Sequence, residues 1–112
     1  MADKEVVVGK TVDGRLLVFF EQSGTSSYSS GGFDITIGSL KEIETVVYVG
    51  NNYGYRTEAA EAQERISNNK FTLPVHYYGY ACPSAPACVT GWEVSSGTDL
   101  SHVTFYGLVI GI

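Results

Sequence analysis

Hydrophobic residues along the chain recur in short runs separated by Gly, Ser or Asn, a spacing typical of β-strands joined by turns. The clearest pair is residues 5–12 and 15–21, which flank Asp13-Gly14. This dipeptide tolerates positive φ and predicts a hairpin closed by a two-residue type I′ turn.

The second strand of this hairpin is apolar on both faces. Leu17 and Phe19 point to one side, and Leu16, Val18 and Phe20 point to the other. Such a strand either is buried on two sides or has one face covered by a partner chain. Leu17 and Phe19 are therefore candidate interface residues.

Further strands follow the same alternation or β-branched composition. They comprise residues 33–37, 43–49, 71–78, 92–94 and 103–110. Residues 22–32, rich in Ser and Gly, are predicted to form an extended loop or edge strand anchored by Tyr28. Pro74 cannot donate to a ladder, which places it at an edge or a bulge.

Residues 57–66 differ from the strands, because their apolar positions fit one face of a short amphipathic helix. Thr57 would be its N-cap, and Glu61 and Arg65 would form an i,i+4 ion pair. An irregular loop or strand is the alternative. With seven or eight short strands and at most one helix, residues 1–112 are expected to form a single all-β domain, an antiparallel β-sandwich or jelly roll.

Composition narrows the functional classes. The chain is 44% hydrophobic and 17% charged, which excludes a disordered chain, and its net charge of −5 disfavours nucleic-acid partners. Residues 1–5 lack a secretory-signal pattern, and the longest apolar run, residues 16–20, is far below the roughly 20 residues that span a bilayer. We expect a soluble protein made in a cytoplasm, with no membrane partner.

The two cysteines, Cys82 and Cys88, lie in one short stretch with two prolines between them. A loop disulfide, two free structural thiols, or a zinc site completed by His76 and His102 would each fit. The gap of five residues is wider than usual for zinc ligands. A structural role for the pair is therefore the prediction, with no metal and no cofactor.

The residues of known catalytic chemistry form no recognisable pattern. The carboxylates are scattered, His76 and His102 are far apart, and no nucleophile elbow, phosphate loop or dinucleotide fingerprint occurs. Asp99 is interpreted as the cap of an Asx turn. We therefore expect no enzyme, although a small hydrolase or metal protein remains an alternative class.

Tyrosines are unusually frequent, with eight in 112 residues. Five of them gather beside Gly and Asn: Tyr53, Tyr55, Tyr77, Tyr78 and Tyr80. Tyrosine offers a large contact area at low entropic cost and is enriched at interfaces. Packing on a sheet face, contact with a partner protein and stacking against a sugar all remain open for these candidate interface residues.

Three segments, in order, carry a resemblance to a known family. Residues 28–33 (Tyr-Ser-Ser-Gly-Gly-Phe) introduce a strand, residues 38–47 lead into another, and residues 93–103 contain the turn Gly-Thr-Asp-Leu-Ser before a last strand. In this order they are similar to elements of the small virion structural proteins of tailed bacteriophages and related archaeal viruses. The resemblance covers residues 15–112 and departs from the pattern at residues 57–66 and 82–88.

The resemblance implies a β-sandwich or jelly-roll subunit without catalytic residues, located in the virion as a head decoration, cement or minor capsid protein. Its expected partners are copies of itself, with trimers favoured because closed rings protect strand edges, and a major capsid protein. A carbohydrate- or receptor-binding module on the particle or tail surface is the alternative.

Overall fold

The computed structural model describes residues 1–77, 80–84, 87–90 and 92–112, with the backbone alone described for 80–84 and 87–90. Its first sheet has four antiparallel strands in the order β1-β2-β9-β4. They are β1 (Lys4–Lys10), β2 (Leu16–Ser23), β9 (Thr104–Gly111) and β4 (Ile43–Asn51). The second sheet, ordered β3-β6-β5, comprises β3 (Phe33–Thr36), β6 (Lys70–Leu73) and β5 (Ile66–Ser67).

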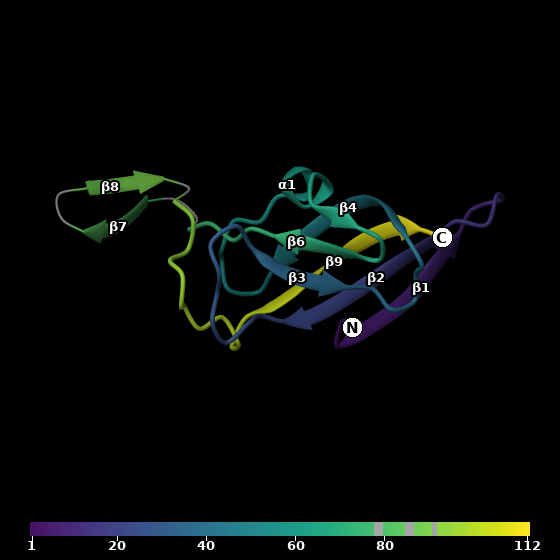
Figure 1. Cartoon of the computed structure of the whole chain (residues 1–112), viewed down its shortest axis with the longest axis horizontal. Helices are drawn as coiled ribbons and strands as arrows, with labels where there is room; N and C mark the ends of the chain where they lie inside the picture. The colour runs from purple at the N-terminus through teal and green to yellow at the C-terminus, as the bar shows by residue number, and fades with distance from the viewer. Residues whose placement is uncertain (78–79, 85–86, 91) are drawn as a thin grey trace.

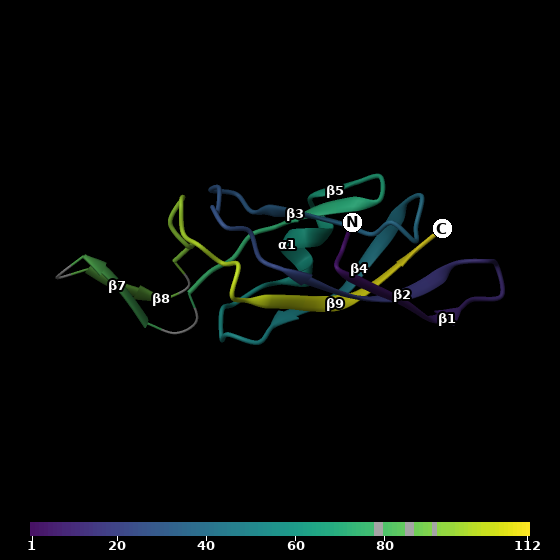
Figure 2. The same ribbon diagram turned by 90° about the horizontal axis from the view of Figure 1, so that it is seen from below.

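These two sheets pack face to face, with the short helix α1 (Ala59–Gln63) beside them (Figures 1 and 2). A third pair of strands, β7 (Tyr80–Ser84) and β8 (Ala87–Thr90), forms a hairpin beyond one end of the sandwich (Figure 1). The prediction of an all-β, sandwich-like fold with one short helix is confirmed. Among the described residues, no helix is long and apolar enough to cross a membrane.

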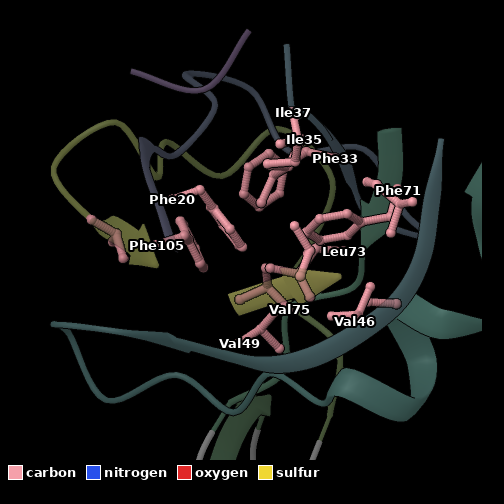
Figure 3. Packing of buried hydrophobic residues seen from close by; sticks show 14 of the residues in the cluster. Phe20, Phe33, Ile35, Ile37, Val46, Val49, Phe71, Leu73, Val75 and Phe105 are labelled. Carbon is pink, nitrogen blue, oxygen red and sulfur yellow. The ribbon is translucent and has the colours of Figure 1, made fainter. Parts of the chain in front are cut away.

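The core lies between the two sheets and is built from the inward positions of alternating strands. Phe20 of β2 meets Phe71 of β6 edge-on, with ring centroids 5.7 Å apart, and Phe33 meets Phe105 at 4.9 Å. Figure 3 shows how these rings interdigitate with β-branched side chains from both sheets. Each fully buried side chain of this kind contributes about 1.5–3 kcal/mol, so this interface is the main source of stability.

The β1–β2 hairpin forms as predicted, but its turn is different. Gly14 has φ 91°, and among the described residues Asn68 is the sole non-glycine at positive φ, so Asp13 is not in the left-handed region. Thr11 N–H donates to the Arg15 carbonyl, and Thr11 Oγ1 accepts from Arg15 N–H. These bonds leave a three-residue loop, Val12 to Gly14, and the type I′ prediction is wrong.

The predicted helix exists but is shorter than residues 57–66. Glu58, with extended backbone, occupies the N-cap position and makes no side-chain cap bond, so the prediction of Thr57 as N-cap is wrong. The helix ends at Gln63, because the chain then turns into β5, where Ile66 pairs with Phe71.

The predicted Glu61–Arg65 side-chain pair does not form. Glu61 Oε1 lies 2.9 Å from His76 Nε2, whereas Arg65 donates to the Glu61 backbone carbonyl and pairs with Glu64 at 3.8 Å. The partner brought by tertiary folding takes precedence over the local i,i+4 partner.

Helix α1 also closes one edge of the four-stranded sheet. The Gln63 side chain accepts a hydrogen bond from Val46 N–H at 2.8 Å and donates to the Glu44 carbonyl at 3.0 Å. The amide thereby occupies two of the β4 backbone groups that another strand could otherwise pair with.

Two further strand predictions need correction. The strand predicted at 71–78 ends as β6 at Leu73, because Pro74 has no N–H for the ladder. The segment predicted as a strand at 92–94 forms only an isolated bridge between Glu93 and His76. The loop at 22–32 is anchored as predicted, since Tyr28 is buried with 1% of its surface exposed.

Candidate functional site

The solvent side of the four-stranded sheet carries an uninterrupted apolar row. Phe19 of β2 lies opposite Val6 of β1 on one side and Leu108 of β9 on the other, and Leu108 lies opposite Tyr48 of β4. Directly opposed residues in antiparallel strands share a face, so this row crosses all four strands. Leu17 and Ile110 form a second opposed pair beside it. We call these six residues the outer apolar face.

The outer apolar face is open to solvent in the single chain. Val6 is 41% exposed and Tyr48 51%, while Leu17, Phe19, Leu108 and Ile110 are partly exposed. In Figure 2 the second sheet and α1 lie on the other side of β2 and β9, and no described strand or helix crosses this side. A single-layer sheet face toward water is normally polar, so this face has the composition of a covered surface.

The charged residues that the ladders place on this side of the sheet lie at one end. Lys4 and Glu21 lie directly opposite each other there, so their charges offset locally. Among the residues that the ladders place on this face, only Lys4 and Glu21 are charged. The middle of the face is neutral.

A small depression lies at the same end of the sheet, between two tyrosine rings. Tyr48 and Tyr106 stand 6.3 Å apart and tilted by 35°, and a Cβ on Gly50 would come within 2.6 Å of Tyr48 Oη. The cavity, about 260 Å³, is completed by Asn51, Tyr55, Arg56 and Thr57, among others. Aromatic rings beside hydroxyl and guanidinium groups suit a small polar ring compound.

The loop after β4 presents the next tyrosines. Asn51 holds this loop, because its Oδ1 accepts from the N–H groups of Tyr53 and Tyr55 and its Nδ2 donates to the Tyr55 carbonyl. Tyr53 is 60% exposed; its ring stacks on Tyr55 at 5.7 Å and meets His102 edge-on at 4.6 Å. Tyr55 lies 6.2 Å from Tyr77.

The structure thus brings three of the five predicted tyrosines together. Tyr53, Tyr55 and Tyr77 form one aromatic group next to His102. Tyr78 lies outside the described residues, and Tyr80 belongs to β7, where the backbone alone is described. The remaining two candidates, Leu17 and Phe19, lie on the outer apolar face.

A separate polar cluster surrounds Glu93. Its carboxylate accepts hydrogen bonds from Tyr28 Oη at 2.7 Å, from Gly31 N–H at 2.7 Å and from Ser30 Oγ at 3.2 Å. Burial alone would raise the pKa of Glu93, but these three donors outweigh it and hold the pKa below its ordinary value. Burial raises the pKa of Tyr28, so its hydroxyl keeps its proton and remains a donor.

This cluster is a structural clamp. Every Glu93 contact named above leads to the loop at 22–32, and the Tyr28 hydroxyl also accepts from Val75 N–H at 3.0 Å. Among the described buried side chains, no nitrogen or oxygen lacks a partner. Asp99 has the predicted role of turn cap, since Ser101 N–H donates to its Oδ1 at 2.9 Å.

Among the described side chains, no three His, Cys, Asp or Glu residues gather closely enough to hold a metal ion. Cys82 and Cys88 lie in β7 and β8, and their side chains are outside what the structure describes. The disulfide, free-thiol and zinc alternatives for this pair therefore remain open.

Sequence reasoning found Leu17 and Phe19 but missed the other residues of the outer apolar face. The signal was present in residues 103–110, where Tyr106, Leu108 and Ile110 alternate with buried Phe105 and Val109. The reasoning that found two apolar faces on residues 15–21, applied also to residues 103–110, would have located the centre of the outer apolar face. Val6 and Tyr48 become visible only through the register of β1 and β4.

No protein-family model, no curated protein and no solved structure matches this chain.

Proposed function

We propose that the protein is a structural subunit of a virus particle, a capsid decoration, cement or minor capsid component that acts through protein–protein contacts. The observation that carries this proposal is the outer apolar face. A neutral apolar sheet surface of this extent is typical of interaction sites rather than of the water-facing side of a monomer.

Two separate surfaces of the subunit would make these contacts. The outer apolar face provides contacts between subunits, while the exposed Tyr53–Tyr55 stack provides a second contact for a major capsid protein. Tyrosine is suited to such a contact, because it supplies a large area with few rotatable bonds and keeps a polar tip for a hydrogen bond. Asn51 fixes the backbone of this loop beforehand, which lowers the entropic cost of docking.

Purified particles test the proposal. Mass spectrometry should find the chain in particles at a fixed ratio to the major capsid protein. Added to particles that lack it, the wild-type protein should bind saturably, and Tyr53→Ala should lower the affinity about tenfold, the effect expected of an interfacial tyrosine. Val12→Ala is the matched control, because Val12 is also fully exposed but sits on the β1–β2 turn. Absence of the chain from particles, together with no binding, would refute the proposal.

The depression between Tyr48 and Tyr106 favours a second candidate, a carbohydrate-binding module on the particle surface. Its volume, about 260 Å³, lies just under the roughly 300–1,000 Å³ of sites for drug-sized ligands and suits one sugar ring. Titration with neutral oligosaccharides should then give saturable binding that is lost in Tyr106→Ala and kept in Tyr77→Ala. If no oligosaccharide binds, the structural role stands alone.

A further inference from the structure

We infer that the outer apolar face is covered by the same face of a second copy of this chain, in a two-fold symmetric dimer with β2 of one copy lying over β9 of the other. The inference rests on the proposed function and names the partner for one of its two surfaces. A two-fold contact is isologous, so one surface serves both copies.

Both edges of the sheet are partly protected against strand addition, which favours association through the face. On the free edge of β4, the Gln63 side chain occupies the Val46 N–H and the Glu44 carbonyl. At the other edge, β1 has a register shift between Val7 and Gly9 and ends in Lys4 and Lys10. Bulges and edge lysines are the usual protection against strand addition. The sequence favoured trimers as a means of covering edges, and these contacts weaken that reason.

Charge favours a second copy over a charged partner. The chain carries −5 overall, so most of its surface would attract a basic partner, whereas the outer apolar face is neutral at its centre. Two acidic copies can approach through a neutral face without burying an unpaired charge. A charged ligand would find nothing to recognise there.

The strand order fixes how the two faces meet. Since β2 and β9 are the central strands, a two-fold axis parallel to them and midway between them places each β2 over the other copy's β9. The same axis places Tyr48 over Val6 of the second copy. Glu21 then faces Tyr106 of the second copy rather than another Glu21, so like charges are kept apart. Aligned sheets pack in this way at about 10 Å separation and a crossing angle near −30°.

The size of the face agrees with a weak, concentration-dependent contact. Four strands about 4.8 Å apart and seven residues long at about 3.4 Å each cover roughly 19 by 24 Å. Side chains on a pleated surface expose more area than this flat footprint. One face therefore contributes somewhat more than about 460 Å² and the two faces together more than about 900 Å², which is the size of a weak, concentration-dependent contact.

Sedimentation equilibrium of the purified full chain tests the inference. As the protein concentration is raised toward millimolar, the wild-type protein should approach twice the mass of one chain. Val6→Glu and Tyr48→Glu should each lower the association constant by at least about tenfold, because each buries a charge in the contact. Val12→Glu, the same change at a fully exposed position on the hairpin loop, should leave the association unchanged. Circular dichroism confirms that each variant is folded.

A charge swap tests the geometry. Val6→Lys and Tyr48→Glu should each weaken the dimer, and the double variant V6K/Y48E should recover most of the lost association, since each Lys would face a Glu of the second copy. Within one copy the two positions are three strand spacings apart, roughly 14 Å, so an ion pair inside a copy does not explain recovery.

The outcomes separate this inference from the proposed function. A wild-type monomer at millimolar concentration, a trimer, or a dimer insensitive to both Val6→Glu and Tyr48→Glu would overturn the inference. A monomer that still binds particles would leave the proposed function standing. A dimer that follows the predictions above but never binds particles would support the inference and refute the particle role.

Discussion

The hydroxyl group of Tyr28 donates a hydrogen bond to the carboxylate of Glu93 at 2.7 Å, across 65 residues of sequence. Around this bond, Tyr28 N–H donates to the Thr98 carbonyl and Gly97 N–H donates to the Tyr28 carbonyl. The first and third of the three segments that carry the family resemblance therefore dock on each other. This clamp closes the end of the sandwich near the loop that carries Tyr53 and Tyr55.

Tyr28→Phe should destabilise the fold by about 2 kcal/mol, because Val75 N–H would lose its acceptor in a buried position and Glu93 would lose a donor. Urea unfolding followed by circular dichroism measures the change. Tyr53→Phe, at an exposed tyrosine, should stay within about 0.5 kcal/mol of the wild type. Equal effects of the two variants would show that the clamp adds nothing.

Acid should weaken the clamp. The hydrogen bonds to Glu93 lower its pKa in the folded chain below the ordinary 4.5, so the stabilisation is complete above pH 4.5 and is lost as pH falls through the lowered value. In Glu93→Gln the unfolding free energy should be lower at pH 7 and should fall less steeply between about pH 5 and pH 3. Parallel pH profiles for the two proteins would contradict this assignment.

Glu5 ties the edge strand β1 to the turn before Leu40. Its carboxylate accepts from Gly38 N–H at 2.9 Å, Ser39 N–H at 2.7 Å and Ser39 Oγ at 2.6 Å. Glu5→Ala should cost about 1–2 kcal/mol and speed hydrogen exchange of the β1 amides. The exposed Glu42→Ala is the control and should change neither quantity.

Gly107 marks a place where the sheet has no room for a side chain. A Cβ there would lie 2.1 Å from the Tyr48 carbonyl oxygen and 2.9 Å from the Phe20 ring. Gly107→Ala should therefore cost about 2 kcal/mol or more, because the backbone of β4 would have to move. Gly9→Ala on β1, where a Cβ would meet only Leu17 at 3.6 Å, should be tolerated. Thermal unfolding of both variants tests the contrast.

Local patterns were sufficient for the sandwich itself. The alternation of Phe33 and Ile35 and the two-faced run around Val18 predicted strands that the structure contains. The anchoring role of Tyr28 was also predictable, since a lone aromatic residue in a Ser- and Gly-rich stretch has few other uses. These patterns depend only on residues that are close in the sequence, so a single sequence is enough to recognise them.

The remaining features depend on register, and one sequence does not display register. The Glu61 side chain contacts His76 rather than Arg65, because β6 and the segment after it bring His76 Nε2 within 2.9 Å of Glu61 Oε1. The continuity of Val6, Phe19, Leu108 and Tyr48 likewise follows from how β1, β9 and β4 align with β2. The turn at Asp13-Gly14 was misjudged because the Thr11 side chain extends the loop by one residue.

Strand β9 lies between β2 and β4, although it is translated long after both (Figure 1). Neither β2 nor β4 can pair with β9 until that late segment has left the ribosome, so the insertion of β9 completes the sheet. Until then, the edge of β2 that pairs with β9 has no partner in the nascent chain. Synthesis in a crowded cell would therefore favour chaperone binding to this early hairpin, and premature termination would yield an insoluble fragment rather than a smaller folded unit.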